Sequence, residues 1–530
     1  MQQIMIGNQY AVKTSNASGQ FVNVRFASKL KESRSWAWED YAEGRPWEVF
    51  TKVSLSRGAV SAILALIIGE IKLALQHSDD DHMSKSLELL VRSLESGDLE
   101  LHVESGKEWV RALNQEVDTY MGFMENYRDP KNLQLEYSSF VGIEDRNRSR
   151  AFRELTTRSA ELTSKLPWRR DFEPDVQQQG DVKSFSSLVV TSYVANVPPR
   201  GVNLPNYEEA KLVGQKNFNL ANVVEGKANF LTLAFLNEED SELLRRFYVE
   251  AFTIKVGIHE LLGHGSGLLL RKDETGKPNF DENLIDPTTN SKASHWYTPG
   301  ATFASVFGSI ASAYEELRAN SIALYLACDP EVMTIFGHEG QQAKEVCLAV
   351  YLSQVFKGLT ALSYYDAKAG WLSAHAQSEF VILRALMERL PSFIDFEDVG
   401  HDDIKISINR TLIPAAAVEA FADFVQKIQI YRLTANHQAG TKLFRTYSEV
   451  DEKWSKLREV VVAKKAGVIE PSFVQGNIIQ RGGNGAPVAY KWIDYPASCE
   501  GLLLSWKERF SRDELRAIQR AVEEYMAEDI

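Results

Sequence analysis

The sequence predicts an α+β fold, in which strands and helices occupy separate stretches of the chain. Three observations lead to this prediction: alternating segments at the start, a long block with apolar residues at helical spacing, and strand-like segments with turn signals near the end. A regular alternation of strand and helix, which would predict a parallel sheet, is not seen. The 530 residues are 44% hydrophobic and 25% charged, which excludes a disordered or collagen-like protein.

The first half of the chain is expected to begin with strands and continue with helices. Residues 1–30 contain FVNVRFA, which alternates apolar and polar side chains with a period of two. Residues 47–165 are expected to be mostly helical, as in SKSLELLVRSLESG, which stops at Gly97, and SRAFRELTTRSAELTSKL. A linker is expected at 167–183, followed by a strand in SSLVVTSYVA and an extended loop in NVPPRGVNLPNYEEA.

The second half is expected to be a helical block from 238 to 429, broken by a polar loop at 272–299. Short strands are expected within 465–492 and an amphipathic helix at 511–530. The most apolar run, AVSAILALIIG, is too short to span a bilayer. We interpret it as a buried helix, and a membrane anchor is the alternative.

Composition limits the partners and the compartment. The net charge of −13 argues against nucleic-acid binding and suits a soluble, cytoplasmic protein. Three cysteines cannot form a disulfide framework, and their odd number fits a reducing compartment. The N-terminus lacks the pattern of a signal peptide. We therefore expect a cytoplasmic protein with neither nucleic acid nor membrane as a partner.

The motif that indicates chemistry is GIHELLGHGSG, in which His264 follows His259 by five residues. Zinc peptidases carry two histidines four residues apart, about 40° apart around a helix, with a glutamate as the general base. A spacing of five opens that angle to about 140°, so a regular helix would not bring both rings to one ion. A π-bulge restores the common face, and Gly263 is where the backbone deforms most easily. We therefore expect a locally widened helix. By itself the pattern also arises by chance.

A second helix, SIASAYEELRAN, offers a third ligand. Glu315 and Glu316 lie in an apolar helical run, where carboxylates are costly unless they are paired or bound to metal. They point about 100° apart, so one can bind a metal while the other orients a histidine. The alternatives are a solvated helix face for the glutamates and a structural role for His375.

These motifs resemble the dipeptidyl peptidase III family of zinc exopeptidases, whose signatures are His-Glu-x-x-Gly-His and Glu-Glu-x-Arg-Ala-Glu/Asp. Here they are HELLGH (259–264) and EELRAN (315–320). The similarity extends over nearly the whole chain, through YMGFMENYRDP, GVNLPNYEEA, SHWYTPGATF and FVILRAL.

The resemblance implies one zinc ion per chain and a set of site residues. The implied metal ligands are His259, His264 and Glu316, and the general base is Glu260. The other residues that the resemblance implies are Glu315 and Asn320 behind the ligands, His375 and Tyr120 at the transition state, and Asp118, Asn203, Asn206 and Lys465 (or its neighbour Lys464) at the substrate.

The resemblance also implies two lobes with a cleft between them. The mixed lobe would comprise 1–138, 187–228 and 465–530, and the mainly helical zinc lobe 139–186 and 229–464. Such an enzyme releases dipeptides from the N-terminus of short peptides, and we expect it to be a monomer.

Three departures from the family pattern keep other functions open. Asn320 replaces an acidic residue, Glu379 stands where an arginine is expected, and about 200 N-terminal residues typical of eukaryotic members are absent. A catalytically weak peptide-binding scaffold of the same fold is the main alternative. A zinc endopeptidase is the third.

Overall fold

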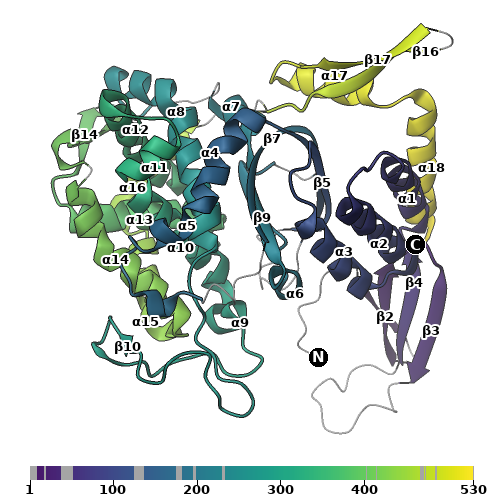
Figure 1. Ribbon diagram of the computed structural model, residues 1–530, viewed down its shortest axis with the longest axis horizontal. Coiled ribbons are helices and arrows are strands. Elements are labelled where there is room, and N and C mark those ends of the chain that lie inside the picture. The colour runs from purple at the N-terminus through teal and green to yellow at the C-terminus, as the bar shows by residue number, and fades with distance from the viewer. Residues whose placement is uncertain are drawn as a thin grey trace.

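The computed structural model describes residues 9–16, 19–37, 52–124, 136–174, 182–194, 198–228, 233–400, 403–413, 415–465, 471, 473–483 and 486–528. Their fold is α+β, as predicted: helices fill one side of the molecule, and sheets lie in the middle and on the other side (Figure 1).

A five-stranded sheet occupies the middle of the molecule and contains β5 (Val117–Phe123), β6 (Tyr137–Glu144), β7 (Val182–Val194), β8 (Gly201–Leu204) and β9 (Gly214–Leu220). The strand order is β5-β6-β7-β9-β8, and only the β7–β9 pair is parallel. Buried and less buried side chains alternate along β5 and β6, which is typical of a sheet with one face on a core. Strand β8 forms the edge of the sheet that contacts the helical region.

The helical region carries most of the long helices. Its helices are α4 (Arg146–Thr157), α5 (Ser159–Thr163), α7 (Ala221–Ala228), α8 (Glu238–Ile258), α9 (Phe303–Phe307), α10 (Ala311–Leu326), α11 (Pro330–Ile335), α12 (Gly340–Thr360), α13 (Ala374–Arg389), α14 (Ala415–Leu433), α15 (His437–Ser448) and α16 (Glu452–Lys465). Three small hairpins accompany them: β10 (Ile285–Asp286) with β11 (Ser291–Lys292), β12 (Tyr365–Asp366) with β13 (Gly370–Trp371), and β14 (Ile394–Gly400) with β15 (Asp403–Ile408).

The N-terminal and C-terminal parts of the chain lie side by side on the other side of the sheet (Figure 1). The N-terminal part contains β1 (Gln9–Asn16), β2 (Gly19–Ala27), β3 (Glu32–Ala37), β4 (Lys52–Ala59), α1 (Ser61–Leu75), α2 (Asp81–Ser96) and α3 (Leu99–Arg111), to which α6 (Glu208–Lys211) is added later. The C-terminal part contains β16 (Asn477–Gly483), β17 (Ala486–Ile493), α17 (Cys499–Arg509) and α18 (Arg512–Glu528), and α18 packs along α1.

Local sequence signals explain where several helices begin and end. The side chain of Asp80 accepts a hydrogen bond from the amide of Met83 and so caps the start of α2. Gly97 ends this helix with a φ of 75°, the left-handed conformation that glycine adopts without strain, as predicted. Arg158 separates α4 from α5 inside the predicted helical segment.

Two hydrophobic cores hold the described residues together. The larger core unites the helical region with the β14–β15 hairpin, and the smaller one joins α1–α3 to the five-stranded sheet. Phe140 packs in the smaller core, although it falls in the range predicted for the zinc lobe. The predicted domain bounds themselves remain a prediction.

The prediction of secondary structure was wrong in three stretches. The range 47–165 also contains β4, β5 and β6, the loop expected at 196–210 contains β8 and α6, and the helical block contains the β14–β15 hairpin. These strands are short, and partners distant in sequence stabilise several of them, so a local pattern does not reveal them. Residues 175–181 of the expected linker lie outside the described part of the chain.

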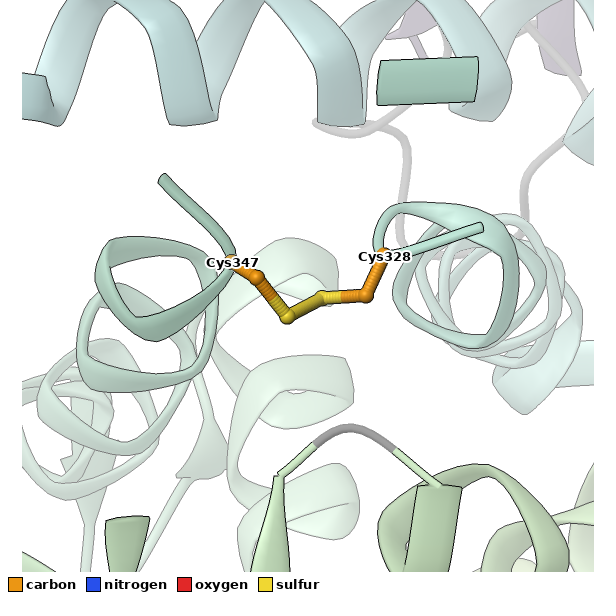
Figure 2. Close-up of a disulfide and its surroundings, with 2 residues drawn as sticks. All are labelled: Cys328 and Cys347. Atoms are coloured by element: carbon orange, nitrogen blue, oxygen red, sulfur yellow. A yellow bond between two sulfur atoms is a disulfide. The ribbon is translucent and has the colours of Figure 1, made fainter. Parts of the chain in front are cut away.

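Two of the three cysteines form a disulfide, contrary to the expectation of reduced thiols. Cys328, just after α10, is bonded to Cys347 on α12, and the bridge joins two helices of the larger core (Figure 2). No local pattern in the sequence predicts this pairing, because the two residues meet only through helix packing. The third cysteine, Cys499, is exposed and is not part of this disulfide.

One helical stretch of the described residues, Gly340–Tyr364, has the length and apolar character of a membrane span. Its most apolar window is 83% buried inside the protein. The apolar run predicted to be a buried helix forms α1, which buries Leu64, Ile68 and Ile71 but exposes Leu66 and Leu73.

Candidate functional site

The two motif histidines lie on a widened helix, as the sequence predicts. Helix α8 continues directly into a π-helical segment, His259–His264. The extra residue per turn brings the two rings to the same side, with centroids 4.7 Å apart and planes at 88°. Their Nε2 atoms are 3.1 Å apart.

Gly263 allows this segment to contact helix α10 closely. A Cβ atom at position 263 would lie 2.9 Å from both Cα and Cβ of Ala319, which is too close for a side chain. Leu261 and Leu262, between the histidines, are buried in the larger core. The π-helical segment is therefore fixed by packing on both sides.

Helix α10 places Glu316 at the two rings. Its Oε2 atom lies 3.5 Å from Nε2 of His259, and its Oε1 atom lies 3.8 Å from Nε2 of His264. The side chain of Glu316 is buried. One ligand atom each from His259, His264 and Glu316 lies within 4.8 Å of the others, so these residues form a group that can hold a metal ion.

The other nitrogen of each ring contacts an oxygen atom on α10. Nδ1 of His259 lies 3.0 Å from Oδ1 of Asn320, and Nδ1 of His264 lies 3.0 Å from Oε1 of Glu315. The amide group of Asn320 donates to Ser378, which leaves its oxygen to face His259. Since both partners are acceptors, both Nδ1 atoms carry the proton.

When both rings are neutral, the two Nε2 lone pairs then face each other, as two ligands of one cation do. Two nitrogens at 2.0–2.1 Å from a tetrahedral zinc ion lie roughly 3.3 Å apart, close to the observed 3.1 Å. The donor set of two imidazoles and one carboxylate is also typical of a catalytic zinc site. The residues therefore fit zinc.

The pKa of His259 is lowered whereas the pKa of His264 is raised, although burial acts to lower both. Burial, together with the neighbouring His264, lowers the pKa of His259 to about 3, so this ring is neutral and ready to bind a metal. Burial also acts to lower the pKa of His264, but its hydrogen bond to Glu315 and the charge of Glu316 outweigh burial and raise it. A metal at this site therefore competes with a proton on His264.

Glu315 is held ionised by two arginines. Nε of Arg432 lies 2.8 Å from its Oε2 atom, and the fully buried Arg318 pairs with both of its oxygens. Burial would raise the pKa of Glu315, but these two charges lower it well below its usual range. The carboxylate therefore fixes the ring of His264, as expected of a residue behind a metal ligand.

Glu260 and His375 complete the surroundings of the cluster. Oε1 of Glu260 lies 3.9 Å from Nε2 of His259, and the side chain is buried against Gly201 at the sheet edge. A Cβ at Gly201 would lie 2.9 Å from Oε1 of Glu260, so only glycine leaves room there. Nε2 of His375, on α13, lies 3.3 Å from Oε2 of Glu316, and its side chain is 56% exposed.

The residues predicted to bind the substrate amine lie in and beside the smaller core. Asp118 is buried, accepts a hydrogen bond from Nε1 of Trp109 at 2.9 Å and forms an ion pair with Nζ of Lys216 at 2.8 Å. Its charge is therefore compensated within the protein. Asn203 donates to Asn217, and Asn206 donates to the carbonyl of Met124.

Tyr120 also lies in the smaller core and not at the histidine cluster. The hydroxyl of Tyr120 is 3.0 Å from that of Tyr207, inside the smaller core. No contact between described residues joins Tyr120 to the histidines. Lys465 ends α16, and its side chain lies outside the described part; its neighbour Lys464 pairs with Asp403. The roles predicted for these residues remain predictions.

Sequence reasoning missed three residues that support the site. Arg318 follows Glu315 by three residues, a spacing that places the two on one helical face and could have indicated their pairing. Arg432 and Ser378 come from α14 and α13, and no local pattern links them to the motif.

Comparison with known proteins agrees with this geometry. A model of Peptidase family M49 matches residues 1–510. The chain belongs to peptidase family M49. It is 33% identical to dipeptidyl peptidase 3 of Nematostella vectensis over 471 residues, which are 88% of this chain and 63% of that protein. It is 32% identical to dipeptidyl peptidase 3 of Homo sapiens over 511 residues, which are 93% of this chain and 67% of that one.

Solved structures share the fold of this M49 chain. The structure of DPP III from Caldithrix abyssi matches with a TM-score of 0.59 and 18% identity, over 82% of this chain and 73% of that one. Dipeptidyl-peptidase III from Corallococcus sp. strain EGB matches with a TM-score of 0.59 and 16% identity, over 77% and 69%. The chain spans 63% of the length of the first of these relatives.

Proposed function

We propose that this M49 chain is a zinc-dependent dipeptidyl peptidase that releases N-terminal dipeptides from short peptides. The observation that carries the proposal is the convergence of His259, His264 and Glu316 on one point, with Glu260 beside it. When bound, zinc supplies a Lewis acid that polarises a peptide carbonyl and makes water more acidic.

The chain's own residues would bind the ion and move protons. The Nδ1 partners Asn320 and Glu315 fix the two rings, so both Nε2 lone pairs face the ion without rearrangement. The carboxylate of Glu260 would take a proton from water and later give it to the leaving amine. The exposed ring of His375 would donate a hydrogen bond to the oxygen on which charge develops.

Replacement of Glu260 tests the proposal. Glu260→Gln keeps the size of the side chain but removes the base, so zinc should stay at one ion per chain while hydrolysis of a dipeptidyl-naphthylamide falls by about 10²–10⁴-fold. Glu242→Gln, on the exposed face of the same helix, is the matched control and should leave both unchanged. An undiminished rate in Glu260→Gln would mean that Glu260 is not the base.

A peptide-binding scaffold is the second candidate, and one observation favours it. Asp118, predicted to receive the substrate amine, already pairs with Lys216. A chain that binds one zinc and short peptides but releases no dipeptide from them, as measured by mass spectrometry, would support the scaffold.

A further inference from the structure

A cluster of cationic side chains lies one to two helical turns before the proposed metal site along α8. Lys255 precedes His259 by four residues on α8, and Arg200 directly precedes Gly201, which touches Glu260. Lys357 comes from α12. Three separate elements therefore bring positive charge to the same side of the site.

Arg200 and Lys357 share one aromatic ring. The guanidinium carbon of Arg200 lies 4.9 Å from the ring centroid of Phe252, and Nζ of Lys357 lies 4.7 Å from it. The two charges are thus within about 10 Å of each other, the screening length at 0.1 M salt. Arg200 also donates to the hydroxyl of Tyr248, whose ring stacks on Phe252.

Lys255 joins the cluster through a glutamine. Its Nζ atom donates to Oε1 of Gln354 at 2.6 Å, and the amide group of Gln354 donates to Glu379. Glu379 lies one turn after His375 on α13, so this chain of contacts runs beside the proposed site. Among the described residues, no direct ion pair joins Arg200, Lys255 or Lys357 to a carboxylate.

Positive charge exceeds negative charge in this cluster. Burial lowers the pKa of Lys357 well below its usual value, and Lys255, Arg200 and Lys227 lower it further, while Glu379 alone acts to raise it. Burial lowers the pKa of Lys255 as well, and Arg200 adds to this while Glu379 opposes it. A bound anion would offset the repulsion between these neighbouring cations.

The geometry points to a binding subsite for a carboxylate of the substrate, formed by Arg200, Lys255 and Lys357. Arg200 and Lys357 are partly exposed, whereas Lys255 is buried and would act on the ligand only through its charge. Phe252, whose ring contacts both Arg200 and Lys357, precedes His259 by seven residues, which is about 10 Å along the helix or about three residues of extended peptide. The carboxylate would therefore lie within about three residues of the cleaved bond. It would come from an acidic side chain or from the C-terminus of a short peptide. This inference rests on the proposed function, because it places the substrate at the metal site.

Peptide binding to the zinc-loaded Glu260→Gln protein tests the subsite without turnover. Calorimetry would compare tetrapeptides that carry Glu or Gln at each position in turn, and the same peptides with a free or an amidated C-terminus. The peptides with Glu or Gln show whether a side-chain carboxylate binds the subsite. The peptides with a free or an amidated C-terminus show whether the C-terminal carboxylate binds it. We expect one of these carboxylates to increase affinity about tenfold, the usual size of a charge-assisted hydrogen bond, and added salt to reduce that factor.

Variants in the same background assign the preference to the cluster. The measured quantity is the affinity for a peptide that carries the carboxylate divided by the affinity for its neutral counterpart. Lys357→Met should bring this ratio close to one, Lys357→Arg should keep it, and Glu379→Gln should raise it. Lys368→Met removes a charge from an exposed position and should leave the ratio unchanged. Because both affinities are measured on the same variant, a change in its fold or in its binding of all peptides does not alter this ratio.

Two results would overturn the subsite: equal binding of every acidic and neutral pair, or a preference that survives both Lys357→Met and Lys255→Gln. A preference that depends on Lys357, in a chain whose wild type cleaves none of these peptides, would instead support the subsite and refute the proposed peptidase.

Discussion

Two buried polar constellations in this chain show opposite ways of handling charge. In the smaller core, Asp118 and Lys216 neutralise each other at 2.8 Å, and Trp109 contacts both. In the helical region, Glu316 faces imidazole rings from His259, His264 and His375. The first group is complete within the protein, whereas the second offers lone pairs to a cation from outside. We propose that Glu316, whose buried carboxylate meets imidazole rings instead of a lysine, helps to bind a metal ion.

The largest effect is expected from removing a ligand of the second group. His264→Ala should lower zinc affinity about 100–1,000-fold, because four ligands together are worth about 10–16 kcal/mol and the share of one ligand is about 2.5–4 kcal/mol. Zinc titration of the purified protein measures this, and Asp118→Asn should keep its metal. One tightly held zinc ion in His264→Ala would remove the distinction between the two constellations.

Breaking the first group should affect stability instead of metal binding. Lys216→Met leaves the carboxylate of Asp118 buried without its partner, and we expect a loss of about 3–4 kcal/mol in the free energy of unfolding. Urea denaturation measures it. The double variant Asp118→Asn with Lys216→Met should recover much of the loss, and zinc per folded chain should not change. A single variant as stable as wild type would show that the pair does not stabilise the core.

The residues behind the ligands should have smaller effects of opposite sign. Glu315→Gln weakens the hold on His264 and should reduce zinc affinity about 10–100-fold. Asn320→Asp gives His259 a charged partner and should raise affinity, by about tenfold at most. Competition with a chelator measures both. Equal affinities in all three proteins would mean that these contacts do not tune the ligands.

The smallest effect is expected from the packing of the π-helical segment. Gly263→Ala forces a methyl group against Ala319 and should cost about 1–3 kcal/mol in stability, with a matching loss of zinc affinity where the rings separate. Gly69→Ala, in a helix with open space around that position, is the control and should stabilise by about 0.5–1 kcal/mol. Thermal unfolding with and without zinc compares them. A neutral Gly263→Ala would show that the close contact is not needed.

The metal-binding cluster could be predicted from the sequence because its parts are local. The five-residue spacing of His259 and His264 required a widened helix, and the structure has a π-helix there. Glu315 and Glu316 had to point in different directions, and they do. The surroundings of Asp118 could not be predicted in this way. Lys216 is 98 residues away in sequence and lies on β9, which two other strands of the sheet separate from β5, so its pairing with Asp118 depends on the tertiary structure.

The sequence by itself determined the α+β class, the stop of α2 at Gly97 and the convergence of two histidines, because each depends on the periodicity or geometry of one segment. Only the tertiary structure decided which charges meet. It brought Cys328 and Cys347 together in a disulfide and paired Asp118 with Lys216. It also placed the cations of the proposed subsite, Arg200, Lys255 and Lys357, near Glu379. These contacts join elements far apart in the chain, and packing of whole helices and strands, which no local pattern encodes, sets their distances.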